Sequence, residues 1–104
     1  MANTLNLDIY RGKTKTMRMT FEGGAAVGDR VRMMVRESLD GEALITKEEV
    51  LDSSMTIVIT IENKDTQQLE PGTYIYDIDL DRGEINVPLI ERSKMRIRGD
   101  VTHD

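Results

Sequence analysis

The chain has 104 residues, a formal net charge of −5 and a sequence pI of about 4.9. A nucleic-acid-binding protein needs a basic surface, so this balance argues against nucleic acid as a partner. The absence of cysteine excludes disulfides and thiolate metal sites. No apolar run is long enough to cross a bilayer, and the first residues lack the apolar core of a signal peptide. We therefore expect a protein that is made in a cytoplasm and does not associate with membranes.

Apolar and polar residues alternate with a period of two along most of the chain, which is the pattern of half-buried β-strands. The alternation predicts strands, in chain order, at about 5–10, 16–21, 30–36, 43–47, 55–61, 73–81 and 85–97. Between them, 22–29 is a glycine-rich loop, and Asp40-Gly41 suits a tight turn with positive φ. Segment 48–54 fits either a strand end or a loop, and the polar segment 63–68 has room for one helical turn. Pro88 lacks an N–H group, which places its half of the last strand at a sheet edge or a bulge.

The segment 65–81, DTQQLEPGTYIYDIDLD, is the most informative part of the chain. A polar turn leads into a strand in which Tyr74, Tyr76, Ile78 and Leu80 share one face. This arrangement is typical of the corner before strand F of a β-sandwich, where a tyrosine hydroxyl bonds back to the preceding turn. We therefore predict an all-β fold, an immunoglobulin-like (fibronectin type III-like) antiparallel two-sheet sandwich of about seven strands. One such domain is expected to span residues 1–104.

Methionine is frequent and phenylalanine rare. Five methionines lie in strand-like segments, where flexible side chains fill gaps between two sheets. The alternative is a ligand surface lined by methionine. The five are Met17, Met19, Met33, Met55 and Met95.

The outward positions of three predicted strands carry charge. In the predicted fold, strand F lies between strands C and G of one sheet. Strand F presents Asp77 and Asp79, and the flanking strands present basic side chains, namely Arg30, Arg32 and Arg36 on one side and Lys94, Arg96 and Arg98 on the other. An acidic stripe between two basic stripes would favour the correct strand register. Alternatively, or in addition, the same arginines form a docking face for another protein.

The register hypothesis leads to a mutational expectation. Reversing the charge of Asp77 to lysine should destabilise the domain more than the same reversal at Glu42, which lies in a loop. Equal effects in denaturant melts would contradict the hypothesis.

No cluster of residues predicts catalysis, a cofactor or a metal. Asp77, Asp79 and Asp81 have the spacing that opens a calcium loop, but such a loop needs glycine at its sixth position and glutamate at its twelfth, which are Arg82 and Pro88 here. Strand alternation explains the spacing better. The single histidine, His103, lies in the tail and leaves no place for a histidine-based triad within the fold. We therefore expect a non-enzymatic protein with no catalytic, cofactor-binding or metal-binding residues.

Several segments together resemble the small immunoglobulin-like domains of tailed-phage and prophage proteins, including the N-terminal domain of the baseplate upper protein and related tail-fibre modules. The residues that carry the resemblance are Arg-Gly-Lys-Thr at 11–14, SLDGE at 38–42, Leu69-x-Pro71-Gly72-x-Tyr74-x-Tyr76-Asp77-Ile78, and Met95-x-Ile97-x-x-Asp100-Val101-Thr102. In fibronectin type III domains the motif Leu-x-Pro-Gly-x-Tyr also occurs. The resemblance covers nearly the whole chain.

The resemblance implies a structural component of a phage or prophage particle, in the tail, baseplate or fibre. It also implies synthesis in the bacterial cytoplasm, incorporation into the virion, and other phage structural proteins as partners. Because such assemblies are symmetric, a homo-oligomer such as a trimer is a further expectation. The exposed edges of the first strand (A) and of the last strand (G) are available for pairing with a partner strand. Alternatively, the lysines and arginines of the last strand protect its edge from pairing. The alternatives are an adhesin-like module that binds a host surface, and an enzyme or enzyme inhibitor.

Overall fold

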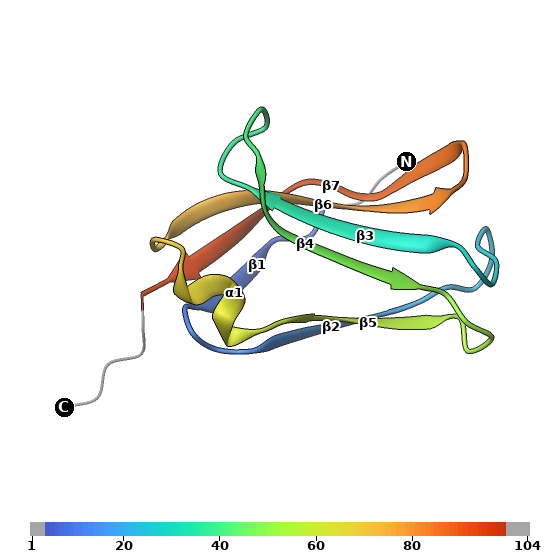
Figure 1. Cartoon of the computed structure of the whole chain (residues 1–104), viewed down its shortest axis with the longest axis horizontal. Helices are drawn as coiled ribbons and strands as arrows, with labels where there is room; N and C mark the ends of the chain where they lie inside the picture. Colours follow the sequence, from blue (N-terminus) through green and yellow to red (C-terminus); the bar gives the residue numbers. More distant parts are fainter. Residues whose placement is uncertain (1–3, 100–104) are drawn as a thin grey trace.

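The computed structural model describes residues 4–99 and contains seven strands and one short helix (Figure 1). The elements are β1 (Leu7–Tyr10), β2 (Lys15–Thr20), β3 (Arg30–Arg36), β4 (Ala43–Val50), β5 (Thr56–Ile61), α1 (Asn63–Gln67), β6 (Gly72–Arg82) and β7 (Ile85–Arg98). The single predicted helical turn is confirmed as α1. The ambiguous segment 48–54 divides between the end of β4 and a turn.

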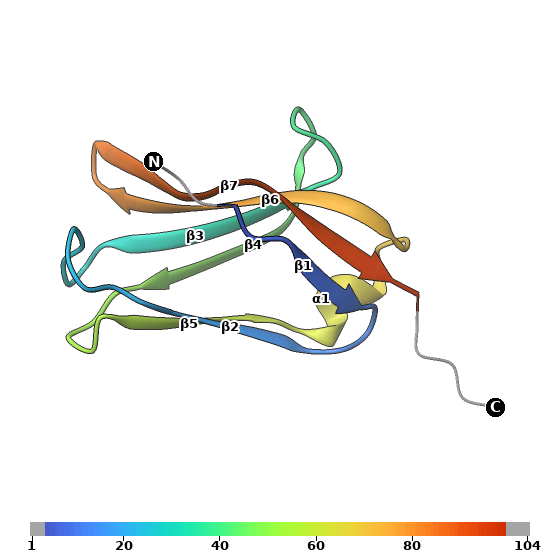
Figure 2. The ribbon, with the colours of Figure 1, turned by 180° about the vertical axis from the view of Figure 1, so that it is seen from behind.

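The strands form two sheets, one of five strands in the order β1-β7-β6-β3-β4 and one of two strands, β2 and β5. The predicted immunoglobulin-like sandwich is confirmed, and so is the position of β6 between β3 and β7. One pairing differs from the prediction, because β1 runs parallel to β7 (Figure 2). These two strands come from opposite ends of the chain, so no hairpin forces them to be antiparallel. The edge expected at strand G is therefore covered by β1 over 95–98.

Alternate residues of the strands fill the space between the two sheets. The side chains of Val31, Ile59 and Ile78 have no exposed surface. Three of the five methionines, Met17, Met33 and Met95, belong to this core, while Met19 and Met55 pack against its margin. The period-two pattern thus identified the buried face of most strands correctly.

The predicted tyrosine corner is present at the start of β6. The hydroxyl of Tyr74 donates a hydrogen bond of 2.6 Å to the backbone oxygen of Glu70, four residues upstream. Burial raises the pKa of the Tyr74 hydroxyl, and the nearby carboxylates of Glu37 and Glu70 act in the same direction. The corner fixes the direction in which the chain enters β6 from α1.

Replacing Tyr74 with phenylalanine should therefore lower the free energy of unfolding by about 0.5–1.5 kcal/mol, the usual net value of one hydrogen bond. Urea denaturation measures the loss. Tyr10→Phe is the matched control, because Tyr10 is 48% exposed. Equal stabilities of the two variants would contradict the structural role of the corner.

Tyr76, two residues further on, fastens the N-terminal segment to the sheet. Its ring is fully buried and its hydroxyl donates to the backbone oxygen of Leu5. The backbone N–H of Leu5 in turn donates to the buried hydroxyl of Ser93, at 2.8 Å. Burial raises the pKa of Tyr76 to about 12. These two hydrogen bonds hold the segment before β1 against β6 and β7.

A lysine points inward from β4, which is the edge strand of the larger sheet. Lys47 is the cross-strand partner of buried Met33, and its side chain is only 20% exposed. Its ammonium group lies 2.7 Å from the carboxylate of Asp65 in α1 and 3.7 Å from that of Glu62. The helix therefore closes this end of the sandwich through a charge contact as well as through packing.

Candidate interaction face

The outer face of the five-stranded sheet carries most of the ordered charge contacts in the described chain. Because β3 and β6 are antiparallel neighbours, Arg30 lies opposite Asp81 and Arg32 lies opposite Asp79. Arg36 lies 3.7 Å from the carboxylate of Asp77, diagonally across the same pair of strands. The predicted basic stripe of strand C beside the acidic stripe of strand F is therefore confirmed. We call Asp77, Asp79 and Asp81 the acidic stripe.

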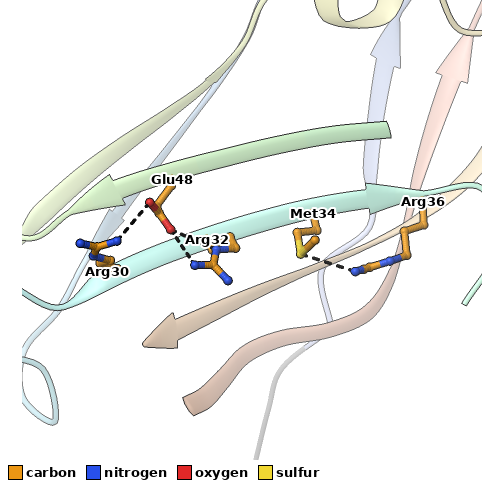
Figure 3. A network of polar contacts seen from close by, with 5 residues as sticks. All are labelled: Arg30, Arg32, Met34, Arg36 and Glu48. Atoms are coloured by element: carbon orange, nitrogen blue, oxygen red, sulfur yellow. Dashed lines mark hydrogen bonds and ion pairs between the residues drawn. The ribbon is translucent and has the colours of Figure 1, made fainter. Parts of the chain in front are cut away.

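Glu48 of β4 binds Arg30 and Arg32 on the side of β3 that is opposite to the acidic stripe of β6 (Figure 3). Its carboxylate accepts hydrogen bonds from Arg32 at 2.8 and 3.0 Å, and it lies 3.7 Å from Arg30. The hydrogen bond to Glu48 and its charge raise the pKa of Arg32. Within residues 4–99, Asp79 and Asp81 form no direct ion pair, although the charges of both also raise the pKa of Arg32. One end of the face is therefore acidic.

The position expected for the second basic stripe is wrong. Lys94 lies opposite Ile75 and Arg96 opposite Thr73, so both lie beyond the end of the acidic stripe. The register of β7 against β6 shifts twice near Asp77. At the first shift, Arg92 adopts a φ of 47°, as in a β-bulge. Local alternation does not reveal an inserted residue, which is why the sequence pattern misplaced the stripe.

The displaced basic residues of β7 lie at the opposite end of the face, around the carboxylate of Asp8. Arg98 donates two hydrogen bonds, of 2.7 and 2.8 Å, to the carboxylate of Asp8 in β1. This contact lowers the pKa of Asp8, as do the charges of Arg96 and Lys15. Within the described part of the chain, Lys94 and Arg96 form no direct ion pair, although Arg96 lies opposite Asp8 in the pairing of β1 with β7. We call Lys15, Lys94, Arg96 and Arg98 the basic patch, and its charge is unexpected on a chain of net charge −5.

Two shallow depressions adjoin the basic patch. One, of about 470 Å³, has Asn6, Thr73 and Arg96 in its wall. The other, of about 490 Å³, also has Thr73 and Arg96 in its wall and extends to Pro71. Arg96 thus lines both depressions, where a carboxylate of another molecule has room to approach it.

The loop 37–42, between β3 and β4, rises over the outer face (Figure 1). Leu39 is 57% exposed and lines a depression together with Asp77, Asp79 and Pro88. The positive φ expected in this turn is not present. The N–H of Gly41 donates to the backbone oxygen of Ser38 at 3.0 Å, and Gly41 does not lie in the left-handed region. The loop stands near the acidic stripe and makes the face uneven.

Asp77 is held differently from the prediction, because the basic group that acts on it is Arg36 of β3 and not the lysine or arginines expected from β7. Burial raises its pKa, the neighbouring charges of Asp79 and Glu91 act in the same direction, and only Arg36 opposes them. Folding therefore favours the protonated acid. The stability that Asp77 contributes is fully present below its unfolded pKa of about 3.9 and is lost as the pH rises through its raised folded pKa.

We accordingly expect Asp77→Asn to leave the domain unchanged or slightly more stable at pH 7.5, by less than about 0.5 kcal/mol. The difference from the unaltered protein should shrink at pH 3.5, where Asp77 is protonated in both states. Glu42→Gln, in the loop, is the control, and urea midpoints at the two pH values are the measurement. A clear loss of stability at pH 7.5 would mean that the Arg36 contact outweighs burial and repulsion.

A further depression, of about 590 Å³, lies at the acidic end, between the loop 22–29 and the β6–β7 turn. Arg82 donates to both carboxylate oxygens of Asp29, at 2.7 and 2.8 Å, and the N–H of Ala26 donates to the same carboxylate. The hydrogen bond from Arg82 is the main reason that the pKa of Asp29 is lowered. Because Arg82 and Ala26 already bind the carboxylate of Asp29, we interpret this contact as one that stabilises the loop 22–29.

The remaining sequence candidates do not converge on one site. Asp77, Asp79 and Asp81 alternate along β6, and no group of three metal-ligating side chains is close enough to hold an ion within residues 4–99. His103 and the motif residues 100–102 lie outside the described residues. The sequence pattern did not place Lys15 and Asp8 beside the other charges of the basic patch, since their position depends on the parallel pairing of β1 with β7. It also missed the loop 37–42 over the face.

Comparison with known proteins supports the fold. No protein-family model matches the chain, and no curated protein matches its sequence. Among solved structures, the extracellular domain of the voltage-gated sodium channel beta4 subunit superposes with a TM-score of 0.51 at 12% identity, over 97% of this chain and 96% of that one. That protein is described as forming parallel homodimers that explain its role in cell-cell adhesion. At this identity the likeness establishes the immunoglobulin-like sandwich alone. No described helix is long and apolar enough to cross a membrane.

Proposed function

We propose that the chain is a non-enzymatic structural component of a phage or prophage particle, in the tail, baseplate or fibre. It acts through protein-protein contact at the outer face of the five-stranded sheet. The observation that carries the proposal is the separation of charge on this face. Within residues 4–99, Lys94 and Arg96 at one end and Asp79 and Asp81 at the other form no direct ion pair, although Arg96 lies opposite Asp8 and Arg32 lies opposite Asp79.

The polar groups of the face suit recognition better than catalysis. Arg32, Glu48, Arg98 and Asp8 hold each other in fixed geometries, whereas the unpaired charges lie exposed or half-exposed on strands. Charged groups of this kind mainly steer a partner and fix its orientation. The sequence resemblance to phage immunoglobulin-like domains supplies the biological setting, and the immunoglobulin-like fold is compatible with it.

The protein composition of purified particles tests the proposal. Particles are purified on a density gradient from an induced or infected culture of the bacterium that encodes the chain, and their proteins are quantified by mass spectrometry. The chain should be present in a fixed ratio to the other structural proteins. Absence of the chain from purified particles would overturn the proposal.

Variants test the face separately from the setting. We expect Lys94→Glu/Arg96→Glu to be lost from particles. Arg18→Glu should be incorporated, because Arg18 is an exposed residue of the other sheet, opposite Val58. Equal incorporation of both variants would leave the particle role intact but exclude the basic patch as the contact.

The alternative is an adhesin-like module that recognises a host surface. Its support is the pair of depressions beside Arg96, which have room for an anionic group, and the adhesive role described for the solved structural neighbour. It predicts a free monomer that binds isolated cell-wall material. Binding to cell walls by the unaltered chain and not by Lys94→Glu/Arg96→Glu would favour this reading.

A further inference from the structure

The two ends of the outer face are complementary to each other. In the described part of the chain, Lys94 and Arg96 of the basic patch and Asp79 and Asp81 of the acidic stripe form no direct ion pair, and the charges that face them, Asp8 and Arg32, are themselves bound to Arg98 and Glu48. The relevant positions of β6, Thr73 and Asp79, are six residues apart, which is about 20 Å along a strand. The chain is too rigid to bring its own two ends together, because both are built on the same continuous strands β6 and β7.

We propose that a second copy of the chain satisfies these charges, with the basic patch of one copy bound to the acidic stripe of the next. The inference rests on the proposed function in one respect, namely that the contact is one of assembly. Lys94 and Arg96 of one copy contact the carboxylates of Asp79 and Asp81 of the other.

The shape of the face determines how the copies meet. The loop 37–42 stands over the sheet, and Leu39 shares a depression with Asp77 and Asp79. This loop prevents two sheets from lying flat against each other over their full length. The copies therefore overlap by their ends, and the basic end of one approaches the acidic end of the other. A parallel arrangement would instead bring like charges together.

The free edges of the larger sheet are less suited to this role. The edge strand β4 carries Lys47 on its inner side and is tied to α1 by a contact of 2.7 Å with Asp65. The other edge consists of β1, which has four residues, and of the part of β7 before Met95 that β1 does not cover, where Pro88 lacks an N–H group. Inward charges and short edge strands both discourage strand addition. A contact through the face is therefore favoured over pairing at these edges.

Exposed ion pairs contribute about 0–1 kcal/mol each and are screened by salt. The contact should therefore be weak, and it should require several pairs at once. We expect association that increases with protein concentration at 50 mM NaCl and is largely lost at 1 M NaCl, where the Debye length falls to about 3 Å.

The test is sedimentation equilibrium of the unaltered chain and of two charge-reversed variants. Lys94→Glu/Arg96→Glu and Asp79→Lys/Asp81→Lys should each associate about tenfold more weakly than the unaltered chain. An equimolar mixture of the two variants should associate again, because each then presents an end that complements the other. Arg18→Glu should behave as the unaltered chain. Circular dichroism verifies folding, and Asp79→Asn/Asp81→Asn replaces the lysine variant if that variant does not fold.

Three results would overturn the proposal. The first is an unaltered chain that remains a monomer at its highest soluble concentration in 50 mM NaCl. The second is association that persists in Lys94→Glu/Arg96→Glu, and the third is a mixture of the two variants that does not associate again.

A monomer that binds a heparin column through the basic patch would assign the patch to an anionic polymer. A monomer that is nevertheless present in purified particles would exclude self-association and retain the proposed function.

Discussion

Replacing Tyr76 with alanine should lower the free energy of unfolding by about 3–5 kcal/mol, the range observed for truncation of large buried aromatic side chains. The ring is fully buried in the middle of β6, so its removal leaves a cavity in the core. The same change removes the hydrogen bond to Leu5 and releases the segment that leads into β1. Because domains of this size have about 5–15 kcal/mol of stability in total, the variant should lie close to the threshold of folding.

Tyr76→Phe removes the hydroxyl and keeps the ring, so it separates the contribution of the hydrogen bond from that of the buried ring. It should cost about 0.5–1.5 kcal/mol, since only one hydrogen bond is lost. The unaltered protein should lose stability between about pH 10 and pH 12, because folding raises the pKa of Tyr76 to about 12 while the unfolded chain ionises near 10. The phenylalanine variant should lose less over this range. An alanine variant no less stable than the phenylalanine variant would contradict the assignment of Tyr76 to the core.

The second large effect is expected at Ile59 of β5. Ile59→Ala should lower the free energy of unfolding by about 2–5 kcal/mol. The side chain has no exposed surface and lies opposite Met17 in the two-stranded sheet. This sheet has only β2 and β5 to cover the inner face of five strands. A cavity in it cannot be filled easily by neighbouring strands of the same sheet.

Val58 provides the control from the same strand. It points to the opposite side and is 38% exposed. Val58→Ala should cost less than about 1 kcal/mol. Urea denaturation of both variants, with unchanged m-values, gives the comparison. Similar losses at the two positions would mean that β5 is not buried on one face, and the two-sheet architecture would be contradicted.

The sequence predicts the fold well because its strongest signals are local. Alternation depends on neighbouring residues, and it identified the strands and the inward positions of Tyr74, Tyr76 and Ile78. The tyrosine corner depends on residues four apart in the chain, Glu70 and Tyr74. Together they indicate the immunoglobulin-like sandwich, in which β6 lies between β3 and β7 and Arg36 lies diagonally across from Asp77.

The interaction face is predicted only in part because its other half depends on distant contacts. The basic patch forms where β1 pairs with β7, which joins Asp8 to Arg98 across 90 positions. The bulge at Arg92 moves Lys94 and Arg96 away from Asp77, and no local pattern marks it. Likewise, Glu48 decides which carboxylates remain unpaired by binding Arg32, its partner on a neighbouring strand. These are properties of register, which alternation alone does not determine.

The inward lysine of β4 also bears on how the protein behaves at high concentration. A foreign strand that added to this edge would have to continue a row in which Lys47 is already committed to Asp65 and Glu62. Charges that face the interior of an edge strand act against open-ended sheet growth. A sheet edge that resists such growth lets the protein reach high concentration with a lower tendency to form fibrils.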